Sequence, residues 1–218
     1  MASKEEQLAQ LQEIRKLMER SSRFISLSGL SGVAAGISAL LGATVAYLYL
    51  GIRPFQSFAG ELLVQEGFSN WGLGYLSFFG LLAFLVLLLA LSSAIFFTTR
   101  KAKAQGQGIW DALTKRLLIN LFIPLASGGI FCLALWSYGL VGLIAPSTLI
   151  FYGLSLINAS KYTLADIRYL GISEIILGLL GLFILGYGLD LWAIGFGVLH
   201  IIYGALMYRK YERSETPG

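Results

Sequence analysis

Six long apolar runs, nearly free of charge, constrain the fold of this chain more than any other feature of its sequence. They have 18 to 26 residues each and cover positions 26–50, 73–98, 117–138, 140–157, 169–187 and 191–208. About 20 apolar residues in a helix span the hydrocarbon core of a bilayer, and a helix satisfies its backbone hydrogen bonds within one segment. Of the 218 residues, 56% are hydrophobic and 13% are charged, so little remains for a domain outside the lipid bilayer. We therefore predict an all-α, polytopic membrane protein with six transmembrane helices.

The third and fourth runs are separated by a single residue, Gly139. One helix through both runs would be about 60 Å long, roughly twice the thickness of the hydrocarbon core. We therefore expect a turn at Gly139.

The lysines and arginines sort almost completely to one side of these six crossings. Fifteen of the 16 fall in the amino-terminal segment, the second and fourth connections and the tail over 209–218, and Arg53 alone falls on the other side. Because segments rich in Lys and Arg are retained in the cytoplasm, we predict a multi-pass inner-membrane protein with both termini cytoplasmic.

Two segments outside the crossings have the pattern of amphipathic helices. Over residues 1–25, Ser3 and Glu6 have the spacing of a capping box, and an apolar stripe follows. This helix is expected either to lie on the inner leaflet or to pair with a second copy as a short coiled coil. Over 55–63, after Pro54, apolar residues again follow helical spacing. That short helix would rest on headgroups or act as a lid over an outward-facing cavity.

The crossings also show a weak repeat of three helical hairpins. Gly29, Ser31 and Gly36 match Gly171, Ser173 and Gly178, and the segment 150–153 resembles the segment 201–204. Small residues let helices approach closely in lipid, so these glycines are interpreted as packing faces. The alternative for the first crossing is that its glycine face forms a homo-oligomer.

The carboxy-terminal hairpin, with Gly171, Gly178 and Gly181 in its first helix and the segments 195–197 and 203–204 in its second, resembles the glycine-spaced hairpins of HdeD-like acid-resistance membrane proteins. The resemblance covers this hairpin alone. It implies a six-crossing bacterial inner-membrane bundle that is linked with acid stress and has no catalytic site.

Glu174 and His200 are the two clearly ionisable side chains well inside the predicted crossings. Such groups are costly in a bilayer, and they usually face the bundle and have a partner. We predict that they form a buried polar pair, which acts either as a proton sensor or relay or as a structural clamp. Further expectations concern supporting polar groups and helix kinks: support from Ser173, Tyr203 or Asn158, and kinks at Pro124 and Pro146.

Other chemistries lack the residues they need. One histidine and one cysteine cannot build a haem or zinc site, and nucleotide-binding and nucleophile motifs are absent from the sequence. We predict no enzyme activity, no cofactor, no metal and no nucleic-acid partner, and the sequence identifies no small-molecule ligand. The predicted function is that of an envelope or stress-associated membrane protein. The alternative is a small channel or transporter subunit with a cavity between helices four to six.

Overall fold

The structure of the chain is a computed structural model that describes residues 28–58, 71–104, 106 and 110–212. The predicted amphipathic helix over 1–25 lies outside these residues, as do positions 59–63 of the predicted interfacial helix.

Helices are the regular elements of the described residues. They are α2 (Gly29–Leu50), α3 (Tyr75–Ala104), α4 (Ala112–Ser137), a 3-10 turn η1 (Val141–Leu143), α5 (Ile144–Ala159), α6 (Ile167–Phe183), α7 (Gly188–Trp192), a π-helical segment η2 (Ala193–Leu199) and α8 (His200–Tyr211). Five segments are long and apolar enough to cross a membrane: α2, α3, α4, η1 with α5, and α7 through α8. α6 has 17 residues, near the lower limit for a crossing. The predicted all-α bundle of membrane-crossing helices is therefore confirmed.

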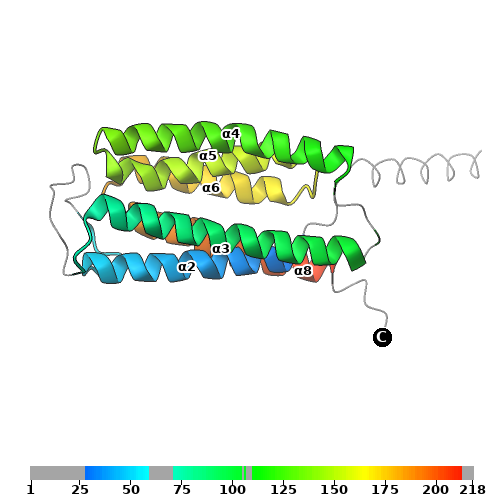
Figure 1. Cartoon of the computed structure of the whole chain (residues 1–218), viewed down its shortest axis with the longest axis horizontal. Helices are drawn as coiled ribbons and strands as arrows, with labels where there is room; N and C mark the ends of the chain where they lie inside the picture. Colours follow the sequence, from blue (N-terminus) through cyan, green and yellow to red (C-terminus); the bar gives the residue numbers. More distant parts are fainter. Residues whose placement is uncertain (1–27, 59–70, 105, 107–109, 213–218) are drawn as a thin grey trace, which may run out of the picture.

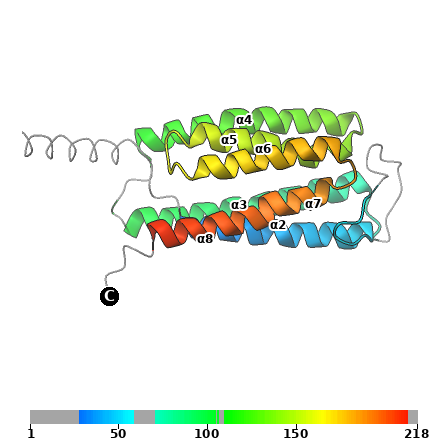
Figure 2. The ribbon, with the colours of Figure 1, turned by 180° about the vertical axis from the view of Figure 1, so that it is seen from behind.

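The helices form two groups of three (Figures 1 and 2). One group holds α4, α5 and α6, and the other holds α2, α3 and α8. Within the groups α5 packs against both α4 and α6, and α2 packs against both α3 and α8. Gly139, with a φ of 72°, lies in the turn after α4, where the sequence places one. α6 and α8, the helices of the last predicted hairpin, belong to different groups but still contact each other, because Ile167 and Leu170 of α6 share an apolar cluster with Met207 of α8.

Two helix ends extend beyond the apolar runs. α3 continues to Ala104 and α4 begins at Ala112, whereas the runs end at 98 and begin at 117. The added turns carry the basic residues Lys101, Lys103 and Lys115. Lys103 and Lys115 are exposed, and long basic side chains can extend their apolar stems along a helix while the charged group stays in water, so a helix can continue past the apolar region. We call this end of the bundle, where α2, α4 and α6 begin and α3 and α8 end, the basic end, and the opposite end the far end.

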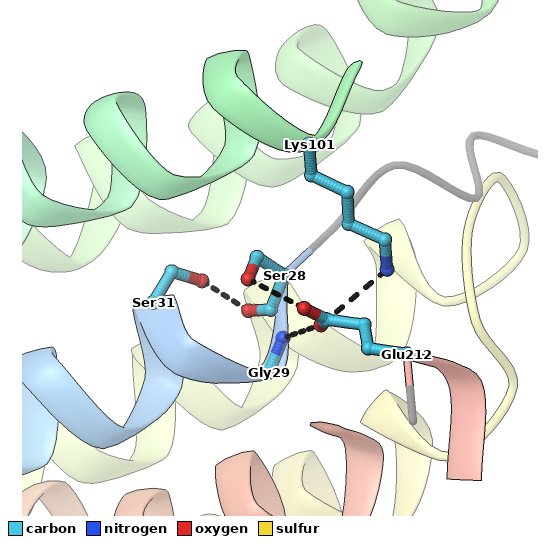
Figure 3. A network of polar contacts seen from close by, with 5 residues as sticks. All are labelled: Ser28, Gly29, Ser31, Lys101 and Glu212. Atoms are coloured by element: carbon cyan, nitrogen blue, oxygen red, sulfur yellow. Dashed lines mark hydrogen bonds and ion pairs between the residues drawn. The ribbon is translucent and has the colours of Figure 1, made fainter. Parts of the chain in front are cut away.

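At the basic end, Glu212 joins the first described helix to the last (Figure 3). The backbone N–H of Gly29 donates to Glu212 Oε1 at 2.6 Å, and the Ser28 hydroxyl donates to Oε2 at 3.3 Å. Lys101 Nζ, at the end of α3, lies 3.4 Å from Oε1. A carboxylate at a helix amino terminus satisfies free N–H groups and interacts favourably with the helix dipole. Glu212 therefore caps α2 and connects it to α3 and α8.

The glycines of the predicted repeat occupy matching places in the structure. A Cβ on Gly29 would collide with the backbone at Gly204, and a Cβ on Gly171 would meet the carbonyl of Gly153 at 2.7 Å. α2 thus packs against α8 in the way that α6 packs against α5, with glycine facing glycine in both pairs. Because α8 covers the glycine face of α2, the homo-oligomer, which remains a prediction, needs another surface.

The residues after Pro54 do not begin a helix. Phe55 has a φ of 61°, in the left-handed region, and its N–H donates to Asp190 Oδ1 at 2.7 Å. This hydrogen bond fixes a turn where the sequence pattern predicts the first helical residues, so the expectation for positions 55–58 is wrong.

α4 begins with an N-cap that the apolar pattern does not show. Asp111 Oδ1 accepts from the backbone N–H and from the hydroxyl of Thr114, both at 2.7 Å. The backbone hydrogen bond from Thr114 holds the pKa of the Asp111 carboxyl below its usual range. The stabilisation is therefore fully present above the unfolded pKa, about 3.9, and is lost as the pH falls through the lower folded value.

Replacing Asp111 with Ala is expected to lower the free energy of unfolding by about 1 kcal/mol at neutral pH, since an N-cap acceptor is lost. The difference should be smaller in strong acid than at neutral pH, because it shrinks as the pH falls through the lowered pKa of the Asp111 carboxyl. Denaturant titration of both proteins in the same detergent measures the effect. Asp111→Asn keeps an acceptor oxygen and should retain most of the stability with less dependence on pH. An equal loss for Asp111→Ala at both pH values would contradict this account.

Candidate functional site

Glu174 and His200 lie together where α6 faces the helix formed by α7, η2 and α8. Glu174 Oε1 is 3.3 Å from His200 Nδ1, and both side chains are buried, with 0% of Glu174 and 5% of His200 exposed. Each residue sits near the middle of its membrane-crossing segment. Neither carboxyl oxygen of Glu174 has a hydrogen-bond partner among the described residues. A buried polar atom without such a partner is uncommon in folded proteins and points to a special role.

Tyr152 of α5 completes the group from a third helix. Its hydroxyl lies 2.9 Å from His200 Nε2. The rings of Tyr152, Phe196 and His200 also contact one another, with Phe196 stacked on His200 at a centroid distance of 5.7 Å. The imidazole is thus held in one orientation by aromatic packing and by a hydrogen bond at each nitrogen.

The second of these hydrogen bonds comes from the π-helical segment η2. His200 Nδ1 lies 3.0 Å from the carbonyl oxygen of Gly195. Because a carbonyl only accepts, Nδ1 carries a proton, an assignment made from the geometry. Glycine is also required at this position for space, since a Cβ on residue 195 would collide with Glu174 Oε2 and with the side chain of Leu149.

One proton shared by a carboxyl and an imidazole leaves the pair neutral. The two neutral forms are the carboxylic acid with imidazole and the carboxylate with imidazolium. Gain or loss of a further proton places a net charge in a medium of low dielectric constant, which costs free energy. The arrangement can therefore hold a proton and, when its charge changes, alter the packing of the three helices around it.

The three polar residues predicted to support the pair lie elsewhere. The Ser173 hydroxyl donates to the carbonyl of Tyr169 on its own helix and is exposed. Tyr203 packs against an apolar cluster that contains Leu156 and Met207. Tyr152 therefore occupies the place that the sequence assigns to Tyr203, because α5 rather than the next turn of α8 faces Nε2.

Asn158, the third of these residues, connects α5 to α4 instead. Its amide donates to the backbone carbonyl of Asn120 at 2.8 Å and lies 3.3 Å from the side-chain oxygen of Asn120. Pro124 explains why that carbonyl is free, because proline has no N–H to donate to the residue four positions earlier. α4 runs through Pro124 without a break in its helical assignment. The proline thus supplies an acceptor for the neighbouring helix.

Pro146 does not interrupt a helix either. α5 begins at Ile144, so Pro146 lies in the first turn, where its missing N–H has no intrahelical partner to lose. The expectation of a kink within this helix is wrong, because the chain between Leu140 and Leu143 is a turn followed by η1.

Asp190 of α7 is a second buried acid, at the far end, and the sequence analysis does not assign it a role. Only 5% of Asp190 is exposed. Its Oδ1 accepts from the hydroxyl of Tyr47 at 2.7 Å as well as from the backbone N–H of Phe55. Asp190 therefore attaches the connection after α2 to the start of the last crossing.

Over the ranges that the structure describes, no group of three or more His, Cys, Asp or Glu side chains could hold a metal ion. Comparisons with protein-family models, with curated proteins and with solved structures found no match to this chain.

Proposed function

We propose that this chain is a non-enzymatic, multi-pass membrane protein that senses pH by binding a proton at the Glu174–His200 pair. The observation that carries the proposal is a wholly buried carboxyl group, without a hydrogen-bond partner in the described part of the chain, placed 3.3 Å from an imidazole nitrogen. Histidine changes its charge in the physiological range, and a buried acid next to it is coupled to that change.

The sorting of basic residues supports an inner-membrane location with the basic end in the cytoplasm. A role in the envelope under acid stress agrees with this proposal and with the resemblance of the carboxy-terminal hairpin to HdeD-like proteins.

The packing around the pair favours sensing over transport. A channel or carrier needs a water-filled path beside Glu174 and His200. Leu149, which is fully buried, fills the space next to Gly195, where a Cβ would meet both Leu149 and Glu174. The proposal accordingly includes no transported species and no catalytic group.

Infrared difference spectroscopy of the purified chain in detergent tests proton binding at Glu174. Between about pH 8 and pH 6, where ordinary exposed carboxyls stay ionised, a carboxylic acid C=O band should appear or shift in the parent protein and be absent from the difference spectrum of Glu174→Gln. In the same pH interval, Glu174→Gln/His200→Gln should take up about one proton less per chain, measured with an indicator dye.

Asp166→Asn is the matched control for these measurements. Asp166 accepts from Lys210 Nζ at 2.7 Å and from the Tyr211 hydroxyl at 2.8 Å, and the hydrogen bond from Lys210 keeps its pKa below the usual range. This carboxyl therefore stays ionised in the interval, and removing it should leave both readouts unchanged. Identical proton uptake by the parent and the double variant would show that the pair is a structural clamp.

A further inference from the structure

The helix that carries His200 links the buried pair to the far end of the bundle through a π-helical segment. α7, η2 and α8 follow one another without a gap, so that Asp190, Gly195 and His200 lie at intervals of five residues along one helix. A π-helical turn has wider hydrogen-bond spacing than an α-helix, and such turns occur most often at functional sites.

Near the carboxy-terminal boundary of η2, the carbonyl of Gly195 and the carboxyl of Glu174 compete for one donor, the Nδ1–H of His200. His200 Nδ1–H lies 3.0 Å from the Gly195 carbonyl and 3.3 Å from Glu174 Oε1. Both acceptors therefore lie within reach of the same N–H. An ionised Glu174 attracts the same N–H more strongly, because charge-assisted hydrogen bonds are the stronger ones. Loss of the proton therefore weakens the bond that His200 makes to η2.

On the amino-terminal side of η2, Asp190 of α7 and the carbonyl of Gly186 hold the described part of the connection after α2. Asp190 Oδ1 accepts from Tyr47 and from the Phe55 N–H, and the Phe58 N–H donates to the carbonyl of Gly186 at 3.1 Å. Phe55 has a left-handed φ of 61°, which is unfavourable for a bulky residue and persists only when surrounding contacts hold it. Attachment of residues 51–58 thus depends on the position of Asp190.

We infer that the proton at Glu174–His200 controls, through the π-helical segment, how firmly residues 51–58 are attached to Asp190. The inference rests on the proposed function and adds the structural change that proton binding produces. With the proton bound, His200 holds Gly195 and the attachment is firm; when the proton leaves, η2 shifts and the attachment loosens.

Among the described residues, few other ionisable groups lie near the Glu174–His200 pair or near Asp190. Tyr152 is the one that α5 brings to the pair, and α2 presents Gly32 and Gly36 to the helix around His200. At the far end Tyr47 of α2 contacts Asp190, and Arg53 is exposed in the same connection.

Hydrogen–deuterium exchange of the full chain in detergent measures the attachment at the Phe55 amide, after correction for the intrinsic effect of pH on exchange. Protection of this amide should fall about fivefold or more between pH 5 and pH 8, the range of a modest coupling between sites. Glu174→Gln imitates the protonated acid and should keep high protection at both pH values. Asp190→Asn should lower protection at both.

Gly195→Ala and Gly197→Ala form the matched pair of variants. Alanine at 195 displaces Glu174 and should abolish the pH dependence, whereas alanine at 197 meets the side chain of Leu40 and should preserve it. If Glu174→Gln shows the same pH dependence as the parent, Asp190 itself is titrating and the inference fails. If protection is constant while the infrared band and proton uptake are present, the coupling is absent although the proton site stands.

Discussion

Gly204→Val is expected to lower the free energy of unfolding by about 3 kcal/mol, at the upper end of the usual cost of overpacking. A Cβ at this position would lie 2.6 Å from the Val33 nitrogen and 2.7 Å from the Gly29 carbonyl oxygen. Both atoms belong to the backbone of α2, so no side-chain rotation can relieve the collision. The two helices have to separate, and the contacts between α2 and α8 are lost together. Denaturant titration in a fixed detergent measures the change.

Gly129→Val is the control for this substitution. Gly129 also lies inside a membrane-crossing helix, but nothing is within 4 Å of a Cβ built on it. Stability should change by less than about 1 kcal/mol, as is usual for exposed sites. Gly153→Val should resemble Gly204→Val, because α5 and α6 repeat the packing of α2 and α8. Equal effects at 129 and 204 would mean that glycine contributes flexibility to these helices rather than close approach.

His200→Leu is expected to destabilise the chain by about 1 to 3 kcal/mol at neutral pH, the cost of leaving buried polar groups without their partner. The substitution leaves the wholly buried Glu174 without its neighbouring imidazole and removes the hydrogen bonds to Tyr152 and Gly195. Glu174→Met/His200→Leu should recover most of this loss, because an apolar pair of similar volume needs no partner. A double-mutant cycle built from unfolding free energies gives the coupling directly.

Lys210→Met provides a comparison on the same helix. Lys210 pairs with Asp166 at 2.7 Å, but its side chain is 59% exposed, so the pair should contribute little to the free energy of unfolding. Additive effects of the substitutions at 174 and 200 would show that the two side chains do not interact, in conflict with the 3.3 Å contact.

The sequence predicts where this chain crosses the membrane because hydrocarbon thickness limits each apolar run. It does not predict which way each helix faces, because lipid and the bundle interior are both apolar and the pattern has no polar face to orient. For this reason the structure, and not the sequence, reveals that α8 packs on α2 and that α6 packs chiefly on α5. The N-cap at Asp111 has a detectable signal, an acidic residue three positions before Thr114, which the search for apolar runs passes over.

The sequence likewise predicts only part of the candidate site. Glu174 and His200 are recognisable because charge inside an apolar run is costly, and their depths along neighbouring crossings agree. Tyr152 has no such signal among the 11 tyrosines of the chain, because its role depends on the rotation of α5 about its axis. The contact between Asn158 and Asn120 likewise depends on a carbonyl that Pro124 leaves free. The structure is needed to show which backbone carbonyl a side chain of the neighbouring helix reaches.

The cap on α2 sets an order for biosynthesis. Glu212 lies 183 residues after Gly29, so the first helix enters the bilayer long before the ribosome supplies the carboxylate that caps it. Until then its glycine face also lacks the surface of α8 that covers it in the finished bundle. A nascent chain that ends before α8 therefore has neither the carboxylate that caps α2 nor the surface that covers its glycine face.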